Sequence, residues 1–170
     1  TIDTSLVDVV GTSHEVLASH GLGDLGGDDV DLLMATMALS RAGITEEDLS
    51  PTELDDLLDQ CRDAKEHLTP QSRRVLIILR GQDVVLPVSD LYTACTPLIE
   101  RSLATMAPLV GRMDDGSPDL TEIAGVYLVG GASGLPLVPR LLRERFGRRV
   151  HRSPYPGAST AIGLAIAADR

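Results

Sequence analysis

Two adjacent glycines at a predicted strand-to-helix junction form the stretch of this chain best suited to chemistry. The run from Val126 to Val129 is typical of a short strand, Gly130 and Gly131 interrupt it, and the apolar pattern after Pro136 predicts a helix. Glycines let the backbone approach a bound group, and the free N–H groups that open a helix favour an anion. The junction therefore predicts an anion-binding turn, although a glycine pair also serves packing alone at many such junctions.

The elements before this turn begin with a predicted hairpin. Partial alternation over Thr4 to Val10 and His14 to His20 indicates two antiparallel strands around a Gly-Thr-Ser turn. The following loop, Gly21 to Asp31, is rich in glycine and in aspartates that can cap a helix over Leu32 to Ala42, which ends near Gly43. The loop lacks the D-x-D-x-D-G spacing of calcium loops, so we reject a calcium site.

A second helix has complete starting signals. Ser50 is the predicted N-cap, Pro51 occupies the first helical position and Glu53 completes a capping box. Its apolar residues recur at intervals of three and four, which predicts one buried face and places Lys65, the only lysine of the chain, on this helix. Those apolar residues are Leu54, Leu57, Leu58, Cys61, Ala64 and Leu68.

A second hairpin and a long helix follow. Arg74 to Leu79 and Asp83 to Val88 are predicted strands joined at a glycine turn, with Pro87 marking an edge. Ser89 is the expected cap of a helix that continues to Leu109 and is kinked by its internal prolines.

The remaining elements surround the glycine turn. Met113 to Thr121 is a polar, flexible connection, and Pro136 to Phe146 forms the helix after the turn. We then expect a short strand near Val150, a loop over Ser153 to Gly157, and a closing helix over Ala158 to Ala168 whose small residues permit close packing.

Composition restricts the function. The 170 residues are 43% apolar and carry a net charge of −10, which indicates a globular chain with one sizeable core or two small ones. A general nucleic-acid surface is excluded by this charge and by the scarcity of aromatic residues. Six arginines between Arg140 and Arg152 are interpreted as a solvated helix end, with a docking site for an acidic partner as the alternative.

The chain also lacks signals for export and for a membrane. Cys61 and Cys95 form neither a disulfide framework nor a C-x-x-C pair, which fits a reducing, cytoplasmic setting. No apolar run approaches the ~18 residues of a membrane span, and no leader opens the chain. Because the first residue is Thr1, we expect a piece of a longer protein.

Three motifs, in the same order, resemble the 70-kDa heat-shock chaperones of the DnaK type, members of the actin and hexokinase superfamily. The glycine turn, with Ser133 and Leu135-Pro136 after it, resembles the adenosine motif of that family. The segment L-G-G-D-D-V-D from Leu25 resembles its L-G-G-E-D-F-D element, preceded by a strand end like E-V-L-A-T-x-G. The stretch S-T-A-I-G-L-A-I-A-A resembles the closing helix, so the likeness covers nearly the whole chain.

The resemblance implies an α/β fold, namely the second lobe of an actin-like ATPase domain. Residues 1–27 and 102–170 would form its ribonuclease-H-like half, with a sheet covered by helices. Residues 28–101 would be an inserted, smaller α/β subdomain. The sheet of the larger half would then lack a central strand, and its backbone groups would stay unpaired unless another chain fills the gap.

The same resemblance implies a site for ATP or ADP with Mg²⁺ between two lobes. Thr1 and Asp3 would end the phosphate-binding turn, near the attacking water and the hydrated magnesium. Phosphoryl transfer needs clamps from both sides, so we expect no ATPase activity from this piece alone. The implied partners are the first lobe, and a nucleotide exchange factor or co-chaperone. The implied adenosine side comprises Gly26, Gly27, Lys65, Thr69, Gly130, Gly131, Ala132, Gly134 and Gly157.

Several positions of that adenosine side depart from the family. Arg62 replaces the carboxylate expected to hold the ribose, and Glu66 replaces an arginine expected to stack on adenine. Gly134 stands where the family has a second stacking arginine, and Ala132 stands where the glycine motif has a serine. Gly157 replaces the aspartate of the closing N-P-D-E loop. Each lost contact removes on the order of 1–3 kcal/mol of binding free energy for the nucleotide. We interpret the exchanged residues Arg62 and Glu66 as a salt bridge on one helix face.

Three functions stay open on the sequence. The ordered motifs favour the nucleotide-binding lobe of a divergent chaperone ATPase. The altered clamp supports a pseudo-ATPase that serves as an interaction scaffold. The remote alternative is a hydrolase using Ser133, but Leu135 stands where G-x-S-x-G needs glycine, and no histidine is placed to serve it. Cys61 and His67 lie off each other's helix face and are interpreted as structural.

Overall fold

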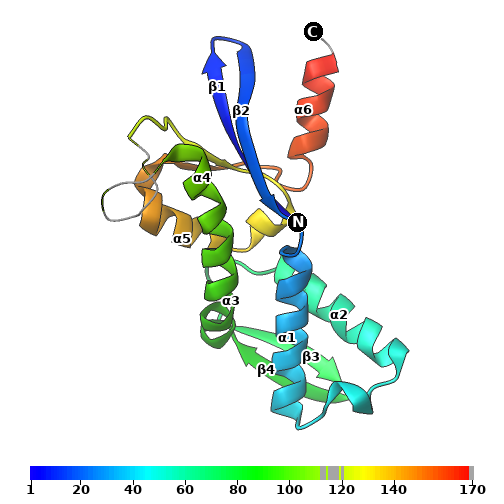
Figure 1. The fold of residues 1–170 in the computed structure, drawn as a ribbon. Coiled ribbons are helices and arrows are strands. Elements are labelled where there is room, and N and C mark those ends of the chain that lie inside the picture. The colour runs from blue at the N-terminus through cyan, green and yellow to red at the C-terminus, as the bar shows by residue number, and fades with distance from the viewer. Residues whose placement is uncertain (112–113, 115–118, 120, 169–170) are drawn as a thin grey trace.

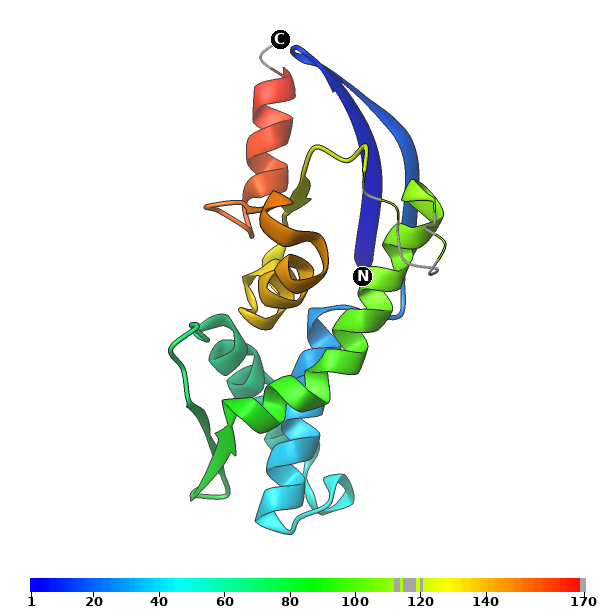
Figure 2. The same cartoon turned by 90° about the vertical axis from the view of Figure 1, so that its left-hand side faces the viewer.

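The computed structural model of the chain describes residues 1–111, 114, 119 and 121–168. Within that part, helices and three two-stranded sheets form an elongated molecule with two halves, and the β1–β2 hairpin projects from one end (Figures 1 and 2). One half contains α1 (Gly27–Ala42), α2 (Pro51–Glu66) and the strands β3 and β4. The other contains the strands β1, β2, β5 and β6 with α4, α5 and α6, and α3 (Val88–Leu103) runs between the halves.

The first predicted hairpin is confirmed, with strands slightly longer than expected. β1 (Ile2–Val10) pairs antiparallel with β2 (Ser13–Leu22), and the register shifts by a bulge between Leu6 and Val7. The turn uses Gly11 at φ 62°, a left-handed conformation that glycine adopts without steric cost. The hairpin contacts the rest of the molecule at the end away from this turn, because the hydroxyl oxygens of Thr4 and Thr105 are 2.7 Å apart.

The two predicted helices of the half with α1 and α2 are confirmed, although α1 begins at Gly27 and not at the predicted Leu32. α1 ends at Gly43, in the left-handed conformation, and begins after Gly26, whose N–H donates to the Asp29 carboxylate at 2.6 Å. At the start of α2, Ser50 accepts from the Glu53 N–H, and the Glu53 carboxylate accepts from the Ser50 N–H at 2.8 Å. The capping box predicted from sequence therefore forms.

The second hairpin covers α1, α2 and α3 with one apolar face. β3 (Arg74–Leu79) pairs antiparallel with β4 (Gln82–Pro87) around Arg80 and Gly81, both at positive φ. The turn also reaches α2, because Arg80 Nε donates to Glu53 Oε1 at 2.9 Å. The alternating residues of the face in the core are Val75, Ile77, Leu79, Val84 and Leu86.

The helix after this hairpin differs from the prediction at both ends. α3 begins at Val88 with Pro87 as its N-cap, whereas the Ser89 hydroxyl donates to Asp90 at 3.1 Å, so Ser89 as the cap is wrong. Strand β4 leads directly into the helix, and this connection sets the start. Pro97 lies inside α3; the break comes at a 3₁₀ turn, Ala104–Met106, before the short α4 (Ala107–Val110).

The elements around the glycine turn agree with the prediction. β5 (Val126–Leu128) pairs parallel with β6 (Val150–Arg152), and α5 (Leu137–Phe146) lies between them in the chain. The closing helix is α6 (Ser159–Ala168), and none of its residues is buried. The expected close packing of α6 is therefore absent from the described residues.

The expected larger sheet is not continuous. Among the described residues β1 pairs only with β2, and β5 pairs only with β6. The predicted connection Met113 to Thr121 lies largely outside the described residues. A search of the described helices finds none that could span a membrane.

We expect the α2 capping box to make stability depend on pH. Hydrogen bonds from Arg80 and Ser50 lower the pKa of Glu53 to about 2 from an ordinary value of 4.5. Since the folded-state pKa lies below the unfolded one, the stabilisation is complete above pH 4.5 and is lost as the pH falls toward 2. Thermal unfolding followed by circular dichroism across this range should show it.

The variant Glu53→Gln should lose this part of the pH dependence and should unfold at a lower temperature at neutral pH. Asp56→Asn, an exposed carboxylate on the same helix, is the matched control and should keep the wild-type profile. Equal pH profiles for wild type and Glu53→Gln would contradict the prediction.

Candidate nucleotide site

The glycine turn after β5 has open space around its backbone. Gly130 adopts φ 88°, and its N–H donates to the Pro156 carbonyl at 2.8 Å, which places the loop before α6 beside the turn. A Cβ built at Gly130, Gly131 or Gly157 would meet no atom within 4 Å. Space is therefore open beside the backbone of this turn.

The start of α1 approaches both the N-terminal residue and the glycine turn. A Cβ added to Gly26 would lie 2.7 Å from the Thr1 backbone nitrogen, a distance that real structures do not tolerate. A Cβ added to Gly27 would lie 3.3 Å from Lys65 Nζ and 3.9 Å from Ala132 Cβ. Predicted site residues from four separate segments thus meet at the start of α1.

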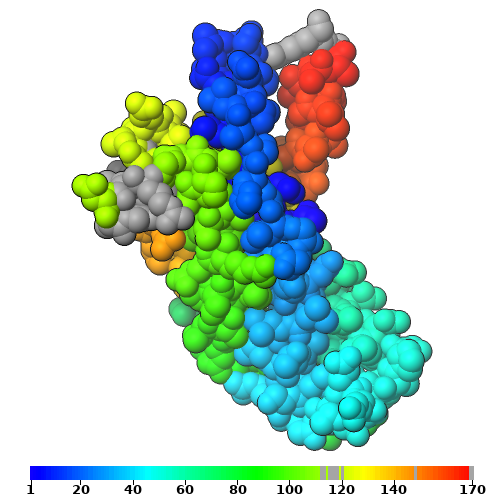
Figure 3. Space-filling view, in the orientation of Figure 1, coloured from blue at the N-terminus to red at the C-terminus, as the bar shows by residue number. Residues whose placement is uncertain are grey.

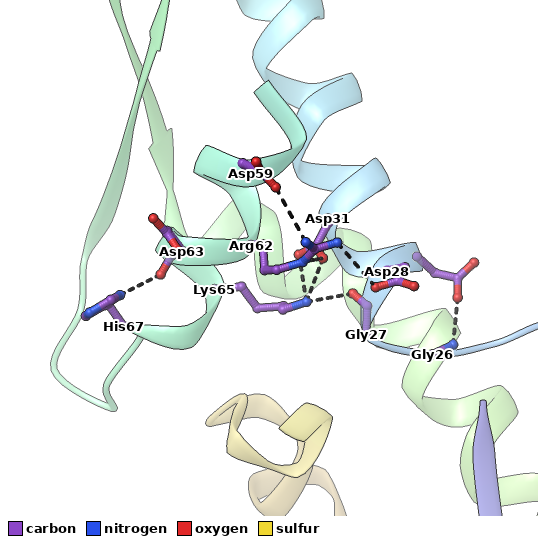
Figure 4. A network of polar contacts seen from close by, with 10 residues as sticks. Gly26, Gly27, Asp28, Asp31, Asp59, Arg62, Asp63, Lys65 and His67 are labelled. Carbon is purple, nitrogen blue, oxygen red and sulfur yellow. Dashed lines mark hydrogen bonds and ion pairs between the residues drawn. The ribbon is translucent and has the colours of Figure 1, made fainter. Parts of the chain in front are cut away.

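Lys65 reaches from α2 to α1 and makes a buried ion pair (Figure 4). Its Nζ lies 2.7 and 2.8 Å from the two carboxylate oxygens of Asp31, and it donates to the Gly27 carbonyl at 2.9 Å. The Lys65 side chain is 11% exposed and that of Asp31 is 3% exposed. Lys65 therefore fixes the first turn of α1 against α2.

Burial has the largest effect on the pKa values of Asp31 and of the two cysteine thiols. It raises the pKa of Asp31, and the Lys65 ammonium opposes that rise. Burial and the Asp31 carboxylate together raise the pKa of the Cys61 thiol to about 12, and burial raises that of Cys95 to about 11. Both thiols are free and buried, so the structural interpretation of Cys61 agrees with the structure.

The predicted salt bridge between Arg62 and Glu66 is wrong. Arg62 instead faces three carboxylates, at 3.4 Å from Asp59, 3.8 Å from Asp31 and 3.9 Å from Asp28 (Figure 4). Two of these acids, Asp28 and Asp31, come from α1, so packing between helices outweighs the i, i+4 preference within one helix.

Asp31 is a residue that the sequence analysis did not single out. It shares the helix face of Met34, Ala35 and Ala38, which are all buried. The sequence signal for this role was an acidic residue on an otherwise apolar helix face. A carboxylate buried on such a face nearly always has a paired cation.

The hydrogen bonds of the other predicted residues lie outside this cluster. The Thr69 N–H and hydroxyl interact with the Ser72 hydroxyl in the turn after α2. The Thr1 hydroxyl donates to Asp3 at 3.4 Å, and a Cβ at Gly21 would lie 2.4 Å from Asp3 Oδ1. Gly134 lies beside Arg152, whose Nη2 donates to its carbonyl at 3.3 Å.

The proposed nucleophile of the hydrolase alternative is used within its own turn. Ser133 is 6% exposed, and its hydroxyl donates to the Gly130 carbonyl at 2.7 Å. A serine nucleophile needs a base in hydrogen-bond contact, and this hydroxyl is bonded to a backbone carbonyl. The described residues also contain no group of three His, Cys, Asp or Glu side chains placed to hold a metal ion.

Comparison with known proteins gives the family of this α/β chain, in which glycine turns approach one another between two halves. A family model described as "Hsp70 protein" matches residues 1–169. The "Chaperone protein HscA homolog" of Burkholderia pseudomallei (strain 668) is 34% identical over 99% of this chain. The homologue from Burkholderia thailandensis is 33% identical over the same share.

The chain therefore belongs to the Hsp70 family. Membership implies the actin-like ATPase fold, and members of the family bind ATP or ADP with Mg²⁺. The chain spans about a quarter of the length of these relatives, 27% in each case. The resemblance drawn from the sequence motifs is thus confirmed.

Breaking the Lys65–Asp31 pair should strongly destabilise the chain. Lys65→Met leaves the buried Asp31 carboxylate without its nearest cation, which costs about 3–5 kcal/mol of unfolding free energy. Arg62→Met, on the same helix, should cost about 1 kcal/mol or less because Arg62 is half exposed. Urea unfolding measures both.

The double variant Lys65→Met/Asp31→Leu should recover most of the lost stability, because no unpaired charge stays buried. A double variant as unstable as the single one would show that the ion pair is not the cause. A small loss for Lys65→Met itself would also contradict the prediction.

Proposed function

We propose that the chain supplies the adenosine side of an ATP- or ADP-binding cleft in an Hsp70-type nucleotide-binding domain. Residues 1–27 and 102–170 would be the ribonuclease-H-like half of the second lobe, and residues 28–101 its inserted subdomain. The single observation that carries the proposal is the approach of Gly27 to Ala132, beside the open turn at Gly130 and Gly131.

Backbone groups, rather than charged side chains, would make most of the contacts to the nucleotide. Gly130 and Gly131 have open space around them, whereas the Lys65 ammonium already donates to the Gly27 carbonyl and to Asp31. Lys65 would therefore act mainly by holding Gly27 in place. Thr69, Ala132, Gly134 and Gly157 remain proposed lining residues, with Thr1 and Asp3 on the phosphate side.

The weakened side-chain clamp favours a second candidate, a pseudo-ATPase scaffold. Arg62 is engaged by three aspartates, and Glu66 is exposed, so neither supplies the contacts that the family pattern places there. In this second candidate the fold presents surfaces to protein partners and nucleotide binds weakly or not at all.

The remaining assignments follow from the proposed function. Hsp70-family chaperones work with co-chaperones, and we infer the first lobe and a nucleotide exchange factor or co-chaperone as partners, in a cytoplasmic setting. We also infer that residues 1–170 alone do not hydrolyse ATP, because the groups that clamp the γ-phosphate from the other side would come from elsewhere.

Calorimetric titration of MgADP and MgATP into the complete nucleotide-binding domain tests the proposal. Gly131→Val is the informative variant, because its side chain would enter open space and leave folding intact while obstructing the turn. It should weaken ADP binding by roughly tenfold or more, which corresponds to about 1.4 kcal/mol. Lys65→Ala should weaken binding too, together with stability.

Gly23→Val is the matched control, because a Cβ at Gly23 also meets nothing within 4 Å but lies in the loop before α1, away from the turn. It should bind nucleotide like the wild type. Unchanged binding by Gly131→Val would overturn the proposed site. Absence of binding by the wild-type domain at millimolar nucleotide would favour the scaffold.

A further inference from the structure

Arg152 places a positive charge beside the glycine turn. It is the last residue of β6, where the parallel register sets it opposite Leu128 at the end of β5. Its side chain is exposed, and its Nη2 donates to the Gly134 carbonyl at 3.3 Å. Within the described part of the chain, no carboxylate forms an ion pair with it. Its charge is therefore available to a ligand of the turn.

The Arg152 guanidinium lies next to the point where a side chain at Gly134 would begin. A Cβ added to Gly134 would be 3.8 Å from Arg152 Nη2, which is ordinary van der Waals contact. Gly134 stands where the family pattern has an arginine that stacks on adenine. The turn has therefore lost its own arginine, and β6 brings another arginine to the same place.

Backbone hydrogen bonds hold Arg152 at the turn. The next residue, Ser153, donates its N–H to the Leu128 carbonyl at 3.1 Å, and the Gly130 N–H donates to the Pro156 carbonyl at 2.8 Å. Helix α6, which follows this loop, has no buried residue and stands apart from the β1–β2 hairpin (Figure 3). The position of Arg152 is therefore set by the turn itself rather than by packing of α6.

Two other arginines that could reach a nucleotide are engaged elsewhere. Arg62 faces three carboxylates of α1 and α2. Arg149, three residues before Arg152, donates to the Ile123 carbonyl at 3.0 Å, which precedes β5, whereas the glycine turn follows it. Of these three arginines, Arg152 is the one that lies at the turn.

We propose that the Arg152 guanidinium stacks on the adenine base of the bound nucleotide and replaces the arginine missing at Gly134. The inference rests on the proposed function, because it assigns a residue to the base of that nucleotide. A guanidinium is planar and weakly hydrated, so it stacks well on a flat aromatic ring. Its N–H bonds lie in its plane, so the bond to Gly134 orients the guanidinium and leaves its face available. The proposed phosphate side belongs to another strand, β1, which favours the base as the ligand.

Calorimetric titration into the complete nucleotide-binding domain tests the assignment with two ligands, MgADP and ribose 5-diphosphate, which has no base. Arg152→Ala should weaken MgADP binding by roughly tenfold and leave the binding of ribose 5-diphosphate unchanged. Equal losses for both ligands would show that Arg152 contacts the phosphates and would overturn the assignment.

Arg149→Ala is the matched control. Arg149 is also an exposed arginine that donates to a backbone carbonyl, but at the other end of β5. This variant should bind MgADP like the wild type. An equal loss of affinity in both variants would assign the effect to the net charge of the domain and would overturn the inference.

Moving the arginine to the turn separates stacking from a structural role. Gly134 is not at positive φ, and its added Cβ would contact the Arg152 side chain, which Arg152→Ala removes. The double variant Gly134→Arg/Arg152→Ala should therefore recover MgADP affinity to within about threefold of the wild type. Failure to recover it, or unchanged affinity in Arg152→Ala, would overturn this inference alone. A wild-type domain that binds no MgADP would overturn the proposed function as well.

Discussion

The ion pair between Lys65 and Asp31 is the contact on which the candidate site depends. It joins α1 to α2 through two side chains that are almost fully removed from solvent. The Lys65 ammonium also donates to the Gly27 carbonyl. Taking two charges out of water is costly, and here the cost is offset by short contacts to both carboxylate oxygens. Because the pair fixes the first turn of α1, it also fixes Gly26 against Thr1 and Gly27 against Ala132.

The local signals of the sequence predicted much of the fold, because those signals are complete within a few residues. The Ser50 capping box, the turn at Arg80 and Gly81, and the strand-turn-helix around Gly130 each depend on contacts or dihedral angles between near neighbours. Each formed where it was predicted. Membership of the Hsp70 family was likewise indicated by three ordered motifs.

The predictions that failed depended on contacts between distant segments. Spacing on one helix pointed Arg62 toward Glu66, but α1 places Asp28 and Asp31 on the other side of it. Ser89 had the residue type of a cap, yet the helix begins at Val88 because β4 leads straight into it. For the same reason the role of Asp31 was not found: a buried acid is recognised by its partner, and that partner lies 34 residues further along the chain.

The phosphate side of the proposed cleft lies at the start of one strand. Thr1 and Asp3 lie at the start of the β1 region, next to Gly26 and Gly21. The Lys65–Asp31 pair would connect this phosphate side to the adenosine side, since it holds the α1 turn between them.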